Sequence, residues 1–185
     1  HNKISELEKS GILIRLKKGL YVVSPKKSGK LLSMELIANH LYGPSYISME
    51  SALRYYGLIP ESVYITQSMT TKHSREFKNS LGKFEYTQCT KEYFAIGIRH
   101  EIKDNTAFLI AQPEKALCDL IVNTPNLNMR FQKEILTYLE DNLRFDMDAF
   151  FKMDTNIFQQ CALVGKKKST ITNIIKIIKK NVSTY

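Results

Sequence analysis

Glu101 and Lys103 are the pair of residues in this sequence whose types and spacing could support hydrolysis. They follow the apolar run 94–98 and are separated by one residue. In a metal-dependent hydrolytic site, carboxylates hold Mg²⁺ and a lysine positions the attacking water. Such a site needs a second acid on an adjacent element, for which the candidates are Glu61 and Glu85. Because short acid-x-Lys patterns are common by chance, exposed charges that end an edge strand explain the pair equally well.

Other chemistry-bearing residues are scattered. The four histidines and three cysteines have no metal-ligand spacing, and no glycine-rich phosphate loop or nucleophile elbow occurs. Cys118 lies in an apolar helical segment, where burial is expected to raise the pKa of its thiol rather than activate it. We therefore expect no catalytic residue, no cofactor and no metal, with reduced thiols in or near a core.

The N-terminal residues predict a helix followed by a hairpin. Residues 2–10 have helical periodicity and end at Gly11. The apolar runs 12–16 and 20–23 are separated by the basic turn Lys17-Lys18-Gly19, which favours a β-hairpin. Residues 26–30 have the composition of a linker.

A helix followed by a hairpin is the order of the recognition helix and the wing in a winged-helix domain. Two helices normally precede the recognition helix, so the winged helix predicted here is partial. The helix would lie in the major groove and the wing would meet phosphates. The expected DNA-binding residues are Asn2, Lys3, Ser5, Lys9, Arg15, Lys17, Lys18 and Tyr21.

The remaining residues predict a mixed α+β domain. Helices are expected over 33–41 and from Ser48, as its cap, to Tyr56. Strands are expected over 63–70, 83–87, 93–102 and 107–111. A further helix is expected over 113–122, with Glu114 and Lys115 as solvated residues at its start. From Arg130 onward the chain is expected to be helical, and its last helix to dock on the core through Ile171, Ile174, Ile175 and Ile178.

The fold class predicted is thus α+β. A winged-helix module over 1–27 precedes a domain over 33–185 that is mixed to about residue 122 and helical after it.

Positive charge is concentrated at the two ends of the chain. The net charge is +9, and residues 1–30 hold eight Lys or Arg against two acids, while residues 164–185 hold six lysines and no acid. Such charge attracts a polyanion, with nucleic acid as the first candidate, although charge runs are often simply solvated faces. Without a signal peptide or a long apolar run, we expect a cytoplasmic protein with no membrane contact.

Several longer motifs resemble the AbiEi antitoxin family. They are Leu-Lys-Lys-Gly-Leu-Tyr-Val-Val at 16–23, the block at 37–53 with Tyr-Gly-Pro-Ser-Tyr-Ile-Ser, Tyr-Gly-Leu-Ile-Pro-Glu at 56–61, Thr-Thr-Lys at 70–72 and the segment at 110–120. The resemblance covers most of residues 12–122. The last fifty residues carry no motif of that kind.

The resemblance implies a DNA-binding autorepressor and antitoxin. Such a protein would bind operator DNA and counteract an AbiEii-type nucleotidyltransferase toxin in phage defence, without a stable complex. Within the motifs, Ile37, Leu41 and Ile47 are interpreted as core, and Arg54 and Lys72 as the residues that face a partner. The alternative function is a Mg-dependent restriction-type nuclease that uses Glu101 and Lys103.

Overall fold

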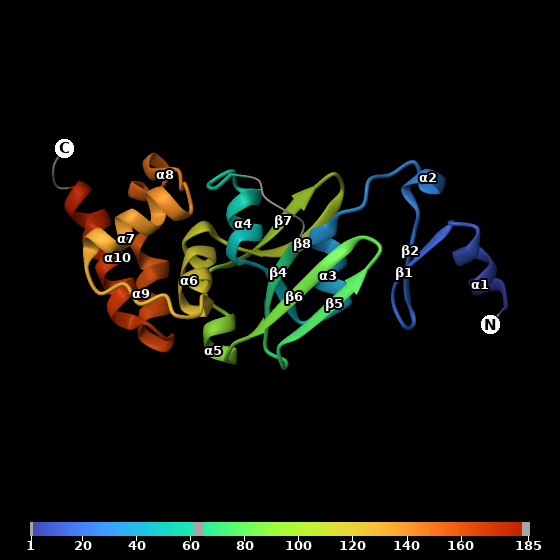
Figure 1. Ribbon diagram of the computed structural model, residues 1–185, viewed down its shortest axis with the longest axis horizontal. Helices are drawn as coiled ribbons and strands as arrows, with labels where there is room; N and C mark the ends of the chain where they lie inside the picture. The colour runs from blue at the N-terminus through green and yellow to red at the C-terminus, as the bar shows by residue number, and fades with distance from the viewer. Residues whose placement is uncertain (1, 61–64, 183–185) are drawn as a thin grey trace.

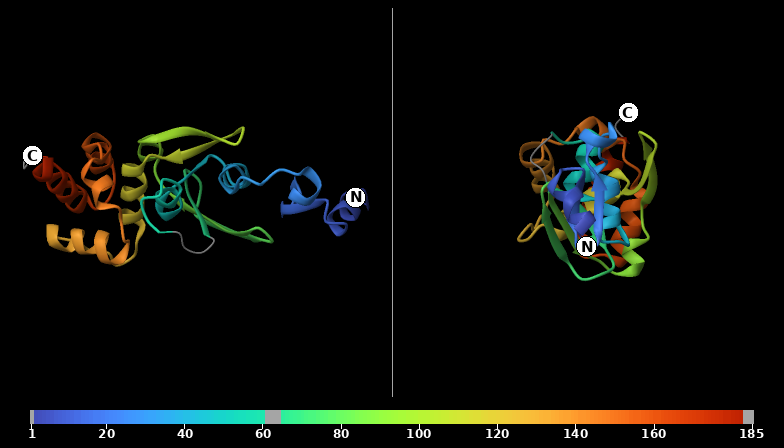
Figure 2. Two further views of the ribbon diagram at one scale, coloured as in Figure 1. Left: turned by 90° about the horizontal axis from the view of Figure 1, so that it is seen from above. Right: turned by 90° about the vertical axis from the view of Figure 1, so that its right-hand side faces the viewer.

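The computed structural model describes residues 2–60 and 65–182 and confirms the α+β class. The molecule is elongated, with a six-stranded sheet in the middle, a small N-terminal module at one end and a group of helices at the other (Figure 1). The two chain termini therefore lie at opposite ends of the long axis (Figure 2).

The N-terminal module consists of a helix, a hairpin and one further helical turn. Its elements are α1 (Asn2–Lys9), β1 (Leu13–Lys17), β2 (Leu20–Val23) and α2 (Pro25–Ser28). Gly11 and Gly19 have φ angles of 71° and 80°, which glycine adopts without steric cost, so the chain turns after α1 and between the two strands as predicted. The linker expected over 26–30 is partly wrong. The short helix α2 begins at Pro25 and covers the first three of these residues, and Gly29 ends it in a left-handed conformation.

The module is anchored to the rest of the molecule next to the turn of its hairpin. Leu16 is buried, and its carbonyl oxygen accepts a hydrogen bond of 3.2 Å from the Asn79 side chain. Lys17 donates a hydrogen bond of 2.6 Å to the carbonyl oxygen of Leu41.

The central sheet has the strand order β5-β6-β4-β3-β8-β7. Its strands are β3 (Ser45–Ile47), β4 (Ile65–Thr70), β5 (Arg75–Asn79), β6 (Gly82–Gln88), β7 (Ile98–Lys103) and β8 (Thr106–Ala111). The pairs β4–β6 and β3–β8 are parallel, and the other three pairs are antiparallel. The short strand β3 is central and fully buried, so residues far apart in the sequence meet at the middle of the sheet.

Four helices accompany the sheet: α3 (Met34–Leu41), α4 (Met49–Tyr55), α5 (Lys91–Phe94) and α6 (Pro113–Asn123). Helix α3 packs against β3, β4 and β8, and α4 packs between β4 and α6. The motif residues Ile37, Leu41 and Ile47 are buried, which confirms their interpretation as core.

The C-terminal part is helical, as predicted. It comprises α7 (Gln132–Thr137), the π-helical turn η1 (Tyr138–Asn142), α8 (Met147–Phe151), α9 (Thr155–Val164) and α10 (Lys168–Val182). The last helix docks on α7, α8 and α9. Ile171, Ile174 and Ile178 are buried as expected, but the fourth buried residue is Ile177, while Ile175 is only half-buried.

Two further sequence expectations are wrong. The predicted strand over 93–102 is divided: its first residues form α5, whose N-terminus is capped by the Thr90 hydroxyl, and β7 begins only at Ile98. The edge strand β5 and the short central strand β3 were not predicted. Within the described residues, no helix is long and apolar enough to cross a membrane.

Candidate functional site

Several of the predicted DNA-binding residues are exposed on the N-terminal module. Lys3, Ser5 and Lys9 are exposed on α1, and Lys18 is exposed in the turn of the hairpin. The backbone of Asn2 begins α1, but its side chain lies outside what the structure describes. The module thus presents lysines from both its helix and its hairpin to solvent.

Arg15 and Tyr21 interact with each other on neighbouring strands. They are cross-strand partners, and the Arg15 guanidinium donates to the Tyr21 hydroxyl over 3.1 Å. Arg15 also lies 3.7 Å from the carboxylate of Glu8 on α1. The hydrogen bond with Tyr21, and then the charge of Glu8, raise the pKa of Arg15. The exposed guanidinium therefore keeps its charge and is held in place across the hairpin.

Lys17 differs from the phosphate-binding role predicted for it. Its ammonium group is bound to the Leu41 carbonyl oxygen and lies 5.9 Å from the centre of the Phe77 ring. In this arrangement it joins the hairpin to the sheet, and Lys18 is the turn lysine that faces solvent.

A cluster of cations and aromatic rings continues from this joint onto the sheet domain. Lys72 lies 5.2 Å from the centre of the Tyr42 ring, and Arg75 lies 4.8 Å from that of Phe77. Lys72 is exposed, as its proposed partner-facing role requires. Because Lys17 contacts the same Phe77 ring, Lys72 before β5 and Arg75 on β5 continue the positive charge from the turn of the hairpin.

Arg54 has mainly internal contacts. Its side chain is 14% exposed and forms an ion pair of 3.0 Å with Glu50, one turn earlier on α4. It also reaches the Ser51 hydroxyl and the Ile65 carbonyl oxygen. This geometry indicates that Arg54 attaches α4 to β4 and does not support the partner-facing role predicted for it.

Glu101 and Lys103 lie on the edge strand β7. Glu101 is paired with Arg99 on the same strand. The candidate Glu85 is on β6, separated from β7 by β4, β3 and β8, and is paired with Lys83. The candidate Glu61 lies outside the described residues. Across residues 2–60 and 65–182, no group of three or more His, Cys, Asp or Glu could hold a metal ion.

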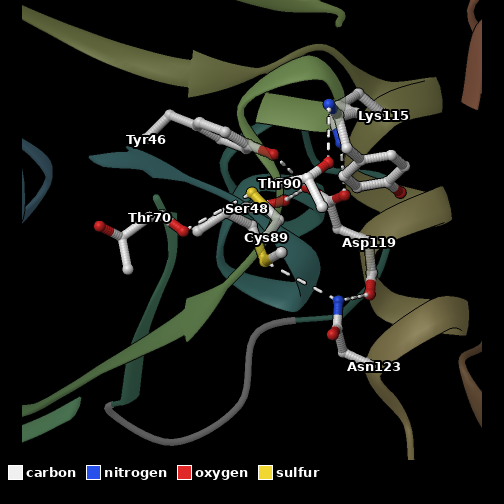
Figure 3. Close-up of polar contacts among 10 residues, drawn as sticks. Tyr46, Ser48, Thr70, Cys89, Thr90, Lys115, Asp119 and Asn123 are labelled. Atoms are coloured by element: carbon white, nitrogen blue, oxygen red, sulfur yellow. Dashed lines mark hydrogen bonds and ion pairs between the residues drawn. The ribbon is translucent and has the colours of Figure 1, made fainter. Parts of the chain in front are cut away.

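The structure also reveals a buried polar cluster that the sequence analysis did not predict. Lys115 and Asp119 form an ion pair of 2.7 Å on α6, and both side chains are fully buried. The second carboxylate oxygen of Asp119 accepts hydrogen bonds from Ser48 at 2.6 Å and Tyr46 at 3.0 Å (Figure 3). The Lys115 ammonium also lies 3.2 Å from the centre of the Tyr93 ring. Each charge is thereby compensated inside the core, as burial requires.

Two expectations are corrected by this cluster. Ser48 was expected to cap α4, but it makes no side-chain capping hydrogen bond and donates to Asp119 instead. Lys115 was expected to be solvated, but it is among the most buried residues of the chain. Lys and Asp four residues apart on a helix favour an ion pair. Their apolar neighbours were the sequence feature that could have indicated burial.

All three cysteine thiols lie near this cluster. Burial raises the pKa of Cys89 to about 11, with the charge of Asp119 adding to the effect. Burial and a hydrogen bond with Cys161 raise the pKa of Cys118, as predicted. That hydrogen bond lowers the pKa of Cys161. The burial of Cys118 and Cys161 confirms that these two belong to the core.

Two glycines allow close packing around the cluster. A Cβ atom on Gly97 would lie 2.9 Å from the Cβ of Lys115, and one on Gly165 would lie 2.7 Å from the Tyr93 ring. Both distances are shorter than van der Waals contact. Glycine at these positions therefore lets the chain before β7 and the end of α9 approach the cluster.

No model of a known protein family matches the chain, and no curated protein matches it.

Proposed function

We propose that this chain is a DNA-binding autorepressor and antitoxin, with its DNA-binding surface on α1 and the β1–β2 hairpin. The observation that carries the proposal is the set of exposed cations on this projecting module, above all Lys3, Lys9 and Lys18. Positive charge on a helix and an adjacent hairpin suits contacts with the phosphates on either side of a groove.

Two cations beside aromatic rings, in and just before β5, support a larger surface. Lys72 and Arg75 lie over the rings of Tyr42 and Phe77, which fixes the positions of charges that would otherwise be mobile. Since Lys17 connects the hairpin to the same ring, the proposed DNA surface extends from the hairpin to this edge of the sheet.

The antitoxin part of the proposal rests on the resemblance of residues 12–122 to the AbiEi family. The partner would be an AbiEii-type nucleotidyltransferase toxin that is counteracted without a stable complex, in a cytoplasmic phage-defence system. We propose that the protein acts by binding and not by catalysis. The separation of Glu85 from Glu101 across the sheet supports this, because it leaves the Glu101–Lys103 pair without that second carboxylate.

A matched pair of triple variants tests DNA binding. In Lys3→Ala/Lys9→Ala/Lys18→Ala, three exposed lysines of the module are removed. In Lys133→Ala/Lys152→Ala/Lys176→Ala, the same charge is removed from exposed positions among the C-terminal helices. Fluorescence anisotropy with promoter DNA is measured over a series of salt concentrations. We expect the plot of log affinity against log salt to become less steep, by about 0.9 for each phosphate that the first variant no longer neutralises. Equal effects of the two variants would contradict the proposed location.

The same variants separate repression from antitoxicity. In cells that express a nucleotidyltransferase toxin from the adjacent reading frame, we expect the module variant to lose promoter repression but to restore growth. We assign antitoxicity to the domain over 33–185, as the resemblance implies. Loss of both activities by a folded variant would contradict that assignment.

A further inference from the structure

A pocket of about 310 Å³ lies beside the buried polar cluster. One wall comes from the ends of β4 and β6 and the loop after β6, and the other comes from α6 and the end of α9. Strands β4 and β6 are parallel, with Thr70 aligned with Gln88, so their carboxyl ends meet at the pocket. In open sheets with parallel strands, ligands bind preferentially outside such ends. The volume lies at the lower end of the range for small-molecule sites.

The pocket is lined by apolar surfaces suited to a flat ligand. Met69, Val122 and the aromatic ring of Tyr93 contribute to its walls. The Tyr93 ring is held between the Lys115 ammonium and the close approach of Gly165, so its orientation is fixed. Because Met69 and Tyr93 are only 1% and 4% exposed, the apolar surface open to a ligand comes mainly from Val122 and Val164, and a flat ring would pack against these two side chains.

Two carboxamides provide polar recognition at the edge of such a ring. The Asn123 nitrogen donates to the Asp119 carbonyl oxygen over 2.7 Å and faces the Met69 sulfur at 3.8 Å. This orients the amide (Figure 3) and leaves its oxygen as the atom available to a ligand donor. The side chain of Gln88 adds a donor and an acceptor. Paired donors and acceptors of this kind match the edge of a nucleobase.

The charge of the lining favours an anionic ligand. Lys166 is exposed and lines the pocket, and none of the described lining residues is Asp or Glu. The neighbouring Lys167 is directed elsewhere, because its ammonium donates to the carbonyl oxygens of Ile121, Thr124 and Leu127. Lys166 is therefore placed to meet an anion at the mouth.

We propose that this pocket binds a nucleoside monophosphate, with the base against Val122 and Val164 and the phosphate at Lys166. The ligand is either a free mononucleotide or an unpaired nucleotide of a nucleic acid, because both offer a base and a phosphate. The site is distinct from the proposed DNA surface on α1 and the hairpin, and the proposal does not depend on that function.

Calorimetry with the full chain tests the proposal. The probes are AMP, GMP, CMP and UMP, the corresponding nucleosides, and short single-stranded oligonucleotides. We expect saturable binding of at least one monophosphate. Val164→Trp places a large side chain at a half-exposed position of the pocket wall and should weaken binding at least about tenfold, or about 1.4 kcal/mol. Leu163→Trp is the matched control, because Leu163 is more exposed and does not line the pocket.

The phosphate contact is tested separately. Lys166→Gln should weaken the monophosphate about tenfold and leave the nucleoside unaffected. Oligonucleotide binding that is abolished in Val164→Trp supports a nucleic acid as the source of the nucleotide. The proposal is overturned if no probe binds at millimolar concentration, or if Val164→Trp binds as well as the unmodified protein. It is also overturned if only the Lys3/Lys9/Lys18 variant fails to bind, since the nucleotide then binds the N-terminal module.

Discussion

The ammonium group of Lys17 is bound to the carbonyl oxygen of Leu41, the last residue of α3, at 2.6 Å. The end of a helix has unpaired carbonyl groups and a partial negative charge, so a cation there is favourable. The bond crosses from the hairpin to the sheet domain. It therefore fixes the N-terminal module through a lysine that sequence reasoning assigned to DNA.

This contact predicts different effects for two adjacent lysines. Lys17→Met should lower the free energy of unfolding by about 1 kcal/mol, since a charge-assisted hydrogen bond is removed at a half-buried position. Lys18→Met should change stability by less than about 0.5 kcal/mol and weaken DNA binding at low salt. Urea denaturation and anisotropy on both variants provide the measurements. Equal stabilities would show that the Lys17 contact contributes nothing to anchoring.

The buried ion pair predicts a strong asymmetry between its two partners. Asp119→Ala leaves Lys115, Tyr46 and Ser48 without their common acceptor, whereas Lys115→Met leaves Asp119 with two hydroxyl donors. Breaking a buried pair costs about 3–5 kcal/mol, and we expect Asp119→Ala to be at or beyond the upper end of that range.

Urea denaturation of the two variants checks this order. Glu50→Ala is the control, because it removes an i,i+4 partner from the partly exposed pair with Arg54 and should cost about 0.5 kcal/mol or less. A larger loss in Lys115→Met than in Asp119→Ala would contradict the role of Asp119 as the common acceptor.

The packing of α10 predicts which isoleucines stabilise the C-terminal helices. Ile178 is 2% exposed, and Ile178→Ala should destabilise the protein by about 2–5 kcal/mol. Ile175 is half-buried on the same helix, so Ile175→Ala should cost clearly less. Thermal or urea unfolding compares the two. A similar loss for both would mean that α10 packs with a different face from the one described.

The stability of the protein should decline at alkaline pH. Burial raises the pKa of Cys89 from 9.0 to about 11 and that of Tyr56 from 10.0 to about 12. The unfolded chain therefore loses these protons first, which favours unfolding as the pH rises. The free energy of unfolding should be insensitive to these groups below about pH 8 and fall progressively above about pH 9.

Urea denaturation between about pH 8 and pH 10.5 measures that decline. In Cys89→Ala the decline should be shallower in the upper part of this range, while in Cys118→Ala the contribution of Cys89 is retained. An identical pH profile for Cys89→Ala and the unmodified protein would show that ionisation of this thiol does not contribute to the loss of stability.

The positions of the carboxylates predict that the protein does not cleave nucleic acids. Incubation with plasmid DNA and RNA in Mg²⁺ or Mn²⁺ should leave both substrates intact, because Glu85 and Glu101 lie on strands separated by three others. Cleavage that is abolished by Glu101→Ala and by Lys103→Ala would establish the nuclease alternative.

Periodicity and capping predicted much of the fold. The helix beginning after Ser33 and the one opened by Pro113 have local start signals, and both form as expected. The run 93–102 has strand-like composition, yet Thr90 caps a helical turn at its start, and Gly97, at a φ of 59°, precedes β7. Strand β5 contains one apolar residue, Phe77, so its formation depends on pairing with β6 and not on its own pattern.

The candidate sites were predictable only where a single element contains them. The exposed lysines of α1 and the hairpin turn follow from local sequence. The buried cluster combines Ser48, Tyr93 and Asp119 from three separate elements, and no spacing rule relates such positions. The inward orientation of Lys115 is likewise set by the packing of α6.

The central position of β3 has a consequence for how the chain folds. This strand pairs with β4 on one side and, through Ile47 and Ile110, with β8 on the other. The middle of the sheet therefore closes only after the ribosome has delivered more than half of the chain. Until then one edge of β3 lacks its partner, and pairings between such distant segments form slowly. The nascent protein should consequently be most prone to aggregation, and most dependent on chaperones, before β8 emerges.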